Sequence, residues 1–368
     1  MRIICLQENL KEGLVILERV TSKNQNLPLL HNISLKTEIG MIKAFATDLE
    51  IGVEVCIPCK VEKQGEVVIP IKTILQFIQN LPNTKITIEI KNKTVFIETE
   101  YNTITIPSFN TNEFPLTPKI KSKNSIEINN ALILKNTLQQ VLNSTAVSYS
   151  LPEITGVLCV VKENTFTFVA TDSFRLAEKI IFEKNTYKTN ITTVFILPQK
   201  TAQELTRIIT TNNPITITVD ENQVMFSLQN ITIISRLING KYPNYEQIIP
   251  KTHKTNIAMQ KNELLNQIKL ASFFSSKIND IKITVKKNKK SIEINASDQV
   301  KGEFHASIPS LEITGEDTEV VFNFKYLIDG LNNLTEDEFI FEMNGPAAPS
   351  LFKTKTGDYR YIIMPIKT

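Results

Sequence analysis

Apolar and polar residues alternate along short stretches of this chain, and segments with helical spacing separate those stretches. Alternation predicts a strand with one buried face, whereas apolar residues three and four positions apart predict an amphipathic helix. Leu10, Leu14, Leu17 and Val20 have the helical spacing and predict a helix over 9–21. One predicted strand precedes this helix and three follow it, which gives the order β-α-β-β-β.

The same order recurs along the rest of the chain. Each third of the sequence divides into two halves, and each half opens with a strand followed by a helix. Later helices are predicted over 72–80, over 131–143 and over 262–274, and the repeat places two more after the openings at 194–200 and 320–325. The last predicted strand covers 359–364. The pattern therefore predicts an α+β chain built from six similar half-units.

A short turn motif marks the period of this repeat. Ala46-Thr47-Asp48, Ala170-Thr171-Asp172 and Ala296-Ser297-Asp298 each follow an alternating strand, and their aspartates lie 124 and 126 residues apart. Short polar side chains can bond the local backbone, so each aspartate is predicted to stabilise a turn. A spacing near 120 residues indicates tandem copies of one unit. We expect three domains, over 1–122, 123–252 and 253–368, with polar linkers at 119–124 and 250–254.

The middle copy of the turn differs from the other two. Phe174 and Arg175 follow Asp172, and neither residue type occurs at the matching positions of the other copies. A departure from a repeat at one copy is a place where function can be added to a structural frame. This turn is therefore the first candidate site.

Composition narrows the class of protein. The chain has 368 residues, of which 42% are hydrophobic, and no apolar segment is long enough to span a membrane. Only 11 glycines are present, which argues against a fold built on glycine-rich phosphate loops. Four cysteines without a secretory signal or a disulfide framework predict a reducing, cytoplasmic location.

Net charge is only +3, but its distribution is uneven. The six predicted helices and their flanks carry eleven basic and six acidic residues, so strands and loops together are slightly acidic. The charge of any single one of these side chains needs no more explanation than a helix face in contact with solvent. Together they predict a helical surface that meets an anionic partner.

Candidate catalytic chemistry is sparse. His31, His253 and His305 occupy different contexts, and no phosphate-binding or nucleophile motif is present. Cys56-Ile57-Pro58-Cys59 matches C-x-x-C, but it lies in alternating sequence and lacks a second ligand pair for zinc. No cofactor and no metal are expected. A thiol redox enzyme using Cys56 and Cys59, a hydrolase using the aspartate turns, and a monomeric basic nucleic-acid-binding scaffold remain the alternatives.

The whole chain resembles the bacterial β sliding clamp family, the DNA polymerase III β subunit. The resemblance is carried by the threefold repeat and by five motifs. These are Leu27-Pro28-Leu29-Leu30, Ala46-Thr47-Asp48-Leu49-Glu50, 170–177, Gly240-Lys241-Tyr242-Pro243-Asn244-Tyr245 and Tyr361-Ile362-Ile363-Met364-Pro365-Ile366. It implies the DNA clamp fold: a head-to-tail dimeric ring with helices lining the central hole. The implied function is a non-catalytic processivity factor in DNA replication that encircles duplex DNA.

The resemblance also implies three groups of site residues. The groove for partner peptides carries over onto Ile154, Thr171, Phe174, Arg175, Leu176, Pro243, Gln247, Ile248, Asn323, Tyr326, Ile362, Met364 and Pro365. Gln247 stands where some members have Arg. Basic positions near DNA carry over onto Lys23, Lys72 and Lys200, whereas the loop over 148–151 lacks the basic residues that some members use. Dimer contacts carry over onto Ile104 and Ile106 on an edge strand, and onto Phe273 and Phe274, two aromatics expected to be exposed at a helix end.

The partners implied by the resemblance are sequence-independent double-stranded DNA, the DNA polymerase III alpha subunit, the clamp loader, and other replication and repair proteins with a clamp-binding peptide. A second copy of the chain would complete the ring, and no membrane partner is expected.

Overall fold

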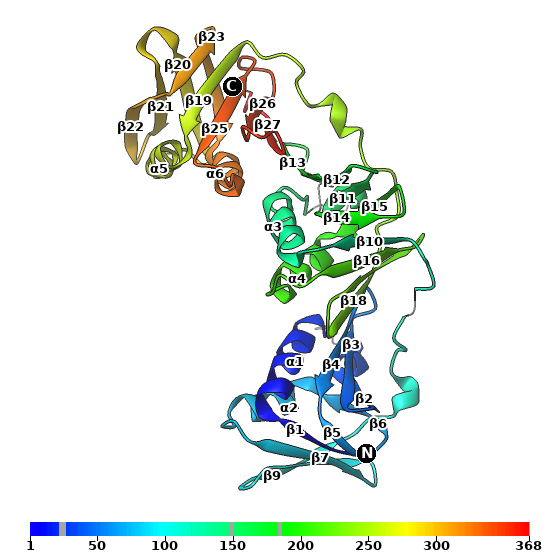
Figure 1. Ribbon diagram of the computed structural model, residues 1–368. Helices are drawn as coiled ribbons and strands as arrows, with labels where there is room; N and C mark the ends of the chain where they lie inside the picture. The colour runs from blue at the N-terminus through cyan, green and yellow to red at the C-terminus, as the bar shows by residue number, and fades with distance from the viewer. Residues whose placement is uncertain (22–26, 119, 148–150, 183–185, 368) are drawn as a thin grey trace. The chain divides into compact units, whose positions relative to one another are not determined.

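The structure is a computed structural model that describes residues 1–21, 27–118, 120–147, 151–182 and 186–367 (Figure 1). The chain divides into two compact units. Unit 1 comprises Met1–Ala131, Lys188–Asn190 and Thr210–Leu237, and unit 2 comprises Leu132–Tyr187, Ile191–Ile209 and Ile238–Thr368. Each unit contains two antiparallel sheets.

Unit 1 holds a five-stranded sheet in the order β5-β1-β7-β8-β9 and a nine-stranded sheet in the order β14-β10-β16-β17-β18-β4-β3-β2-β6. The strands of the smaller sheet are β1 (Arg2–Leu6), β5 (Lys60–Lys63), β7 (Lys85–Lys91), β8 (Thr94–Glu98) and β9 (Thr103–Pro107). The strands of the larger sheet are β2 (Asn32–Glu38), β3 (Met41–Thr47), β4 (Ile51–Pro58), β6 (Glu66–Pro70), β10 (Ser125–Ile128), β14 (Tyr187–Thr189), β16 (Ile215–Val219), β17 (Gln223–Ser227) and β18 (Ile231–Arg236).

Helices α1 (Gln7–Val20) and α2 (Ile71–Gln79) pack against each other in unit 1 (Figure 1). The predicted apolar stripe of α1 is fully buried at Leu10, Leu14 and Leu17. Gly13 lets this helix approach β4 closely, because a Cβ at that position would lie 2.5 Å from Cδ1 of Ile57. The stripe and the glycine together dock α1 on the sheet.

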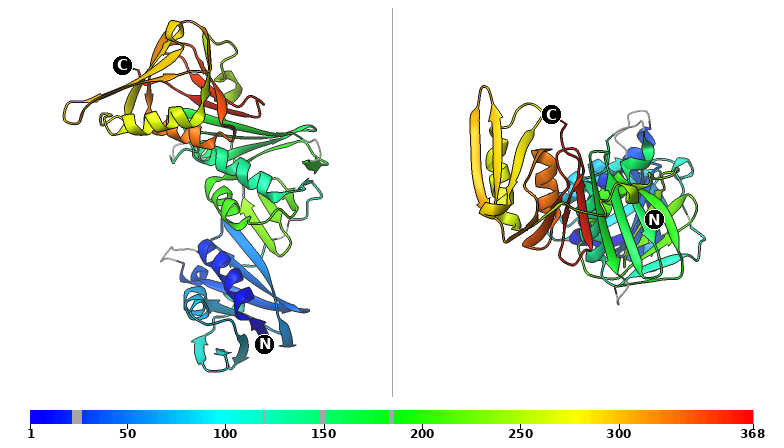
Figure 2. Two further views of the ribbon diagram at one scale, coloured as in Figure 1. Left: turned by 60° about the vertical axis from the view of Figure 1, so that its left-hand side comes forward. Right: turned by 90° about the horizontal axis from the view of Figure 1, so that it is seen from above.

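Unit 2 holds a nine-stranded sheet in the order β15-β11-β12-β13-β27-β26-β25-β19-β23 and a four-stranded sheet in the order β22-β21-β20-β24. Figure 2 shows its C-terminal strands in orange and red. The strands of the larger sheet are β11 (Gly156–Val161), β12 (Thr165–Thr171), β13 (Arg175–Phe182), β15 (Thr193–Pro198), β19 (Thr255–Gln260), β23 (Glu312–Gly315), β25 (Glu338–Met343), β26 (Ser350–Lys353) and β27 (Tyr359–Ile363). Those of the smaller sheet are β20 (Asp280–Lys286), β21 (Ser291–Asp298), β22 (Gly302–Pro309) and β24 (Thr318–Asn323). The helices are α3 (Ala131–Leu142), α4 (Gln199–Ile208), α5 (Lys261–Ser272) and α6 (Phe324–Asn333).

The predicted order of elements is confirmed, with shifts at the ends. The helix expected over 9–21 begins at Gln7, and the one expected over 262–274 ends at Ser272. Sequence reasoning missed the short strands β5, β14 and β23, because three or four residues are too few to show alternation. Lys23, Lys119 and residues 148–150 lie outside the described residues.

The three turn aspartates have the predicted local role. Each one accepts backbone N–H groups from the residues two and three positions later, at 2.8–3.1 Å. These bonds join Asp48 to Glu50 and Ile51, Asp172 to Phe174 and Arg175, and Asp298 to Val300 and Lys301. Each carboxylate therefore stabilises its own turn, and this local role leaves the hydrolase alternative without support.

Candidate functional site

Two strands far apart in the sequence meet at the divergent turn of the middle repeat. β13 pairs with β27, so that Leu176 lies opposite Ile362. The N–H of Met364 donates to the carbonyl oxygen of Phe174 at 2.9 Å, which extends the pairing past the end of β27. The turn and the segment after β27 therefore form one surface within unit 2.

The base of this surface is a buried apolar cluster. Its members are Ala146, Ile154, Leu158, Val169, Leu176, Ile196, Tyr242, Leu351 and Ile362, with Tyr245 and Ile249 packed against it. Three of the predicted groove residues, Ile154, Leu176 and Ile362, belong to this cluster. Predicted residues Pro243, Gln247 and Ile248 lie in the segment that Tyr242, Tyr245 and Ile249 attach to it.

The rim of the surface remains open. Phe174 is 61% exposed and Ile248 is 42% exposed, and Pro243 and Gln247 are also exposed. Large apolar side chains left open beside a buried apolar cluster are typical of a surface that another molecule covers. Such a surface suits apolar side chains of a peptide.

Arg175 is held in place by groups from three elements. Its Nε donates to Oδ2 of Asp172 at 2.9 Å, and its Nη1 donates to Asp329 of α6 and, at 3.4 Å, to Oη of Tyr361. Burial alone would lower the pKa of Arg175, but Tyr361 and Asp329 outweigh burial and raise it. The guanidinium is therefore a fixed cation in the wall of the surface.

The remaining predicted groove residues lie around α6 and the turn. The guanidinium of Arg175 stacks on the ring of Tyr326, and Asn323 caps α6 by accepting the N–H of Lys325 at 3.0 Å. Thr171 donates its hydroxyl to the carbonyl oxygen of Arg175 at 2.7 Å. Pro365 lies in the segment tied down by the N–H of Ile366, which donates to the oxygen of Val321 at 2.8 Å.

Sequence reasoning missed Asp329 and Tyr361 as partners of Arg175. Asp329 lies in a helix of the third repeat, 154 residues along the chain from Arg175, and nothing in its local pattern distinguishes it from an ordinary surface acid. Tyr361 was visible only as one apolar position of an alternating strand. The pairing of β13 with β27 brings Tyr361 to the turn, and the hydroxyl of Tyr361 bonds the oxygen of Tyr326 on α6, the helix that carries Asp329.

Basic residues recur at one position of three helices. Lys72, Lys200 and Lys325 are each the second residue of their helix, in α2, α4 and α6, and all three are exposed. A cation in the first turn opposes the helix dipole, so these lysines do not serve helix stability. With the observed bounds the six described helices carry nine basic and six acidic residues, a smaller excess than the sequence predicted because Lys23 and Lys277 fall outside those bounds.

Two of the edge strands bear on the predicted dimer contacts. β9 ends the five-stranded sheet and β22 ends the four-stranded sheet. Ile104 on β9 is half-buried, and Ile106 is only 4% exposed because it packs into its own sheet. The expectation of two exposed aromatics holds only for Phe273, which is 70% exposed; Phe274 is half-buried and stacks on Phe304 with ring centres 6.0 Å apart.

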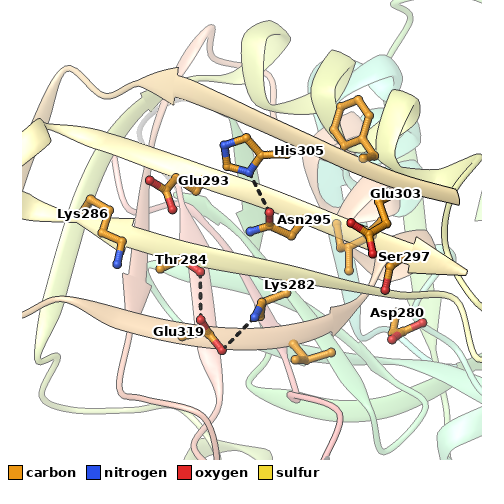
Figure 3. Close-up of a pocket in the computed structure, with 14 residues that line it drawn as sticks. Asp280, Lys282, Thr284, Lys286, Glu293, Asn295, Ser297, Glu303, His305 and Glu319 are labelled. Carbon is orange, nitrogen blue, oxygen red and sulfur yellow. Dashed lines mark hydrogen bonds and ion pairs between the residues drawn. The ribbon is translucent and has the colours of Figure 1, made fainter.

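A polar hollow of about 570 Å³ covers one face of the four-stranded sheet (Figure 3). Figure 3 shows Glu319 between Lys282, at 3.3 Å, and the hydroxyl of Thr284, at 3.2 Å. His305 and Asn295 are joined at 2.7 Å. Each of these groups is satisfied by a neighbour.

Neither metal nor thiol chemistry is supported within the described residues. They contain no group of three His, Cys, Asp or Glu side chains placed to hold a metal ion. Burial raises the pKa of Cys59 and is the main cause of the raised pKa of Cys56, whereas a reactive thiol needs a lowered pKa. No helix among the described residues is long and apolar enough to cross a membrane.

Comparison with known proteins identifies the family. Three family models of the DNA polymerase III beta subunit match the chain: the N-terminal domain over 1–118, the central domain over 128–244 and the C-terminal domain over 246–367. The beta sliding clamp of Synechococcus elongatus is 26% identical, over 100% of this chain and 99% of its own length. The one from Staphylococcus epidermidis is 25% identical over 95% of each chain.

Solved structures agree with this result. The DNA polymerase sliding clamp from Bacillus subtilis superposes with a TM-score of 0.94 at 26% identity, and the match covers 100% of this chain and 99% of that one. The DNA polymerase III beta subunit from Thermotoga maritima, at 22% identity over 100% of this chain and 99% of that one, has the same fold with a TM-score of 0.91. The family models together span nearly the whole chain, and the chain therefore belongs to the DNA polymerase III beta subunit family of bacterial β sliding clamps.

Proposed function

We propose that this chain works as a DNA sliding clamp, a non-catalytic processivity factor that closes into a head-to-tail homodimeric ring around duplex DNA. Its three domains would span 1–122, 123–252 and 253–368. The ring would act in the cytoplasm. It would tether the replicative polymerase and other proteins that carry a suitable peptide.

The lysines at the start of α2, α4 and α6 are the observation that carries the DNA-facing part of this proposal. Lys72, Lys200 and Lys325 occupy one repeated position where the helix dipole disfavours a cation, so an external anion is the simplest reason for them. Contacts with phosphate carry no sequence information. A small positive excess attracts DNA weakly, as sliding requires, because each additional phosphate contact would tighten binding.

Ring closure would use the edge strands β9 and β22. An unpaired edge invites pairing with another chain, and β9 and β22 lie in the first and last thirds of the sequence. Two copies related by a twofold axis would pair β9 of each copy with β22 of the other, so both of these edges would be covered twice. Ile104 and the exposed Phe273 would lie in these contacts, with Ile106 and Phe274 contributing from beneath.

The surface around Phe174 and Arg175 would bind partner peptides. Its apolar base, exposed aromatic rim and fixed cation suit a short segment with Leu and Phe side chains. Such segments would come from the DNA polymerase III alpha subunit, the clamp loader and repair proteins. Gln247 would offer an amide where some members offer a guanidinium, which weakens one polar contact.

Retention on closed DNA tests the proposal. Clamp placed on a nicked circle by its loader should remain bound at high salt and leave when the circle is linearised, because salt screens phosphate contacts but cannot open a ring. A monomeric basic scaffold would instead be lost equally from circular and linear DNA at high salt. That second result would overturn the topological mechanism.

A further inference from the structure

A second, smaller hollow lies in unit 1, at the turn between β3 and β4. Its volume is about 220 Å³, below the roughly 300–1,000 Å³ of most small-molecule pockets, so it fits a peptide side chain better than a cofactor. Its lining comes from this turn, from β18 and from the segment after Phe114. The lining residues are Thr47, Leu49, Glu50, Ile51, Gly52, Pro115, Leu116, Pro118, Gln223, Ile234 and Arg236.

The hollow repeats the construction of the surface around Phe174. Gly52 of β4 lies opposite Ile234 of β18, as Leu176 lies opposite Ile362 in unit 2. The N–H of Arg236 donates to the oxygen of Glu50 at 2.9 Å, which reproduces the bond from Met364 to Phe174. Pro115 follows a buried Phe114, as Pro243 follows a buried Tyr242.

The turn itself is preformed. The hydroxyl of Thr47 donates to the oxygen of Ile51 at 2.8 Å and accepts the N–H of Leu49 at 2.9 Å. Thr171 makes the same two bonds in the other turn. Leu49 has φ +77°, a left-handed conformation that disfavours a leucine, and its side chain is 47% exposed. Ser173 has φ +75° at the matching position of the other turn, so the left-handed residue belongs to the turn geometry that the two surfaces share.

The chemistry of the two surfaces differs at two positions. Ile51 replaces the tethered Arg175, and Arg236 replaces Met364. Arg236 is exposed, and no carboxylate of the described residues forms an ion pair with it. Leu116 at the rim is 90% exposed. The hollow thus offers an apolar base, an apolar rim and one available guanidinium that can bind a carboxylate through two hydrogen bonds.

We propose that this hollow is a second peptide site, which binds an extended segment of a partner protein containing a leucine followed by an acidic residue. The leucine enters the hollow over Ile234 and Gly52, and the acidic side chain pairs with Arg236. Glu50, the other charge of the lining, repels such a peptide and limits its affinity. The site is separate from the surface around Phe174 and does not depend on binding there.

Methyl NMR on the full-length chain labelled at isoleucine δ1 carbons tests this site. The probe is the peptide acetyl-Gly-Ser-Leu-Asp-Glu-Gly-amide, and Ile51→Val and Ile234→Val variants assign the two reporting signals. We expect saturable shifts at Ile51 and Ile234 and none at Ile362 or Ile248. The same peptide with Lys-Lys in place of Asp-Glu should bind at least tenfold more weakly.

Two variants separate the proposed contacts. Arg236→Glu should weaken binding of the acidic probe at least tenfold, and Glu50→Gln should bind it at least as well as the natural chain. Unchanged signals from the remaining isoleucines confirm that each variant is folded. The proposal is wrong if the Ile51 and Ile234 signals do not shift, if Arg236→Glu binds equally well, or if the basic peptide binds better. A failure of the surface around Phe174 would show separately, as absent shifts at Ile362 with a Gln-Leu-Ser-Leu-Phe peptide.

Discussion

The guanidinium carbon of Arg175 lies 4.5 Å from the centre of the Tyr326 ring. This contact joins the turn before β13 to α6, and the bond from Arg175 to Asp329 joins the same two elements. A stacked, doubly paired arginine loses little freedom when a ligand arrives, so the wall of the peptide surface is ordered beforehand.

Replacing one carboxylate of this network should weaken peptide binding. In Asp329→Asn the guanidinium of Arg175 loses a charged partner and gains freedom, and we expect the Kd of a labelled Gln-Leu-Ser-Leu-Phe peptide to rise about three- to tenfold. Fluorescence anisotropy measures the change. Glu163→Gln, which removes an exposed acid elsewhere in unit 2, should bind normally; an unchanged Kd in Asp329→Asn would show that Arg175 needs no tether from α6.

Ending the chain at Ile363 should remove one side of the peptide surface. The bonds from Met364 to Phe174 and from Ile366 to Val321 are lost, together with the flexible thioether. Burial of a Leu and a Phe side chain contributes roughly 1.5–3 kcal/mol each, and we expect a loss of at least ~1.4 kcal/mol, about tenfold in Kd. Anisotropy with the same peptide tests this, while light scattering checks that the oligomer is intact. If the shortened chain binds the peptide as well as the natural chain does, the peptide site lies elsewhere.

Replacing Gly330 of α6 by alanine should lower the free energy of unfolding. A Cβ there would lie 2.4 Å from Cδ1 of the fully buried Tyr361, which itself bonds Arg175. Overpacking of about 1–3 kcal/mol should exceed the ~1 kcal/mol that alanine gains over glycine in a helix. Urea unfolding should show a lowered midpoint for Gly330→Ala. Asn332→Ala, at an exposed position of the same helix, should stay within about 0.5 kcal/mol of the natural chain.

The dimer contact should be sensitive to charge at Phe273. Light scattering of the natural chain at micromolar concentration should give about twice the 41.7 kDa chain mass. Phe273→Asp places a carboxylate in an apolar interface and should give the monomer mass. Phe174→Asp alters a similarly exposed aromatic outside the proposed contact and should remain dimeric. If Phe273→Asp is still a dimer, Phe273 does not lie in the dimer contact.

Asp358 should make the stability of unit 2 dependent on pH. Burial raises the pKa of Asp358, but hydrogen bonds from Lys179, Thr354 and Thr356 outweigh burial and hold the pKa below its usual 3.8. Because the pKa is lower in the folded chain, the stabilisation is present above about pH 4 and is lost as the pH falls through the folded value.

The matching experiment is urea unfolding of the natural chain and Asp358→Asn at pH 7 and pH 3. At pH 7 the variant should be less stable by about 1–3 kcal/mol, as for a hydrogen bond to a charged group. At pH 3 the difference should shrink. A difference of equal size at both pH values would assign the effect to packing and not to ionisation.

The alternation and helix spacing predicted the repeated elements and the local role of the three aspartates, because those features depend on neighbours in sequence. They could not predict that β27 would lie between β13 and β26, since alternation shows which face of a strand is buried but not which strand lies beside it. The partners of Arg175 follow from that pairing and were missed. The same limit applies to Ile106, whose burial depends on the packing of a whole sheet, and to the open hollow beside Arg236.

The place of β27 in the middle of its sheet also has a consequence for synthesis. β13 leaves the ribosome about 180 residues before the strand that will cover its edge, a delay on the order of ten seconds or more at the usual rates of translation. Until then β13 is a bare edge beside a buried apolar face, and it is exposed to pairing with other nascent chains. We therefore expect the growing polypeptide to depend on chaperones through that interval, and slowed translation of the final third to lower its yield.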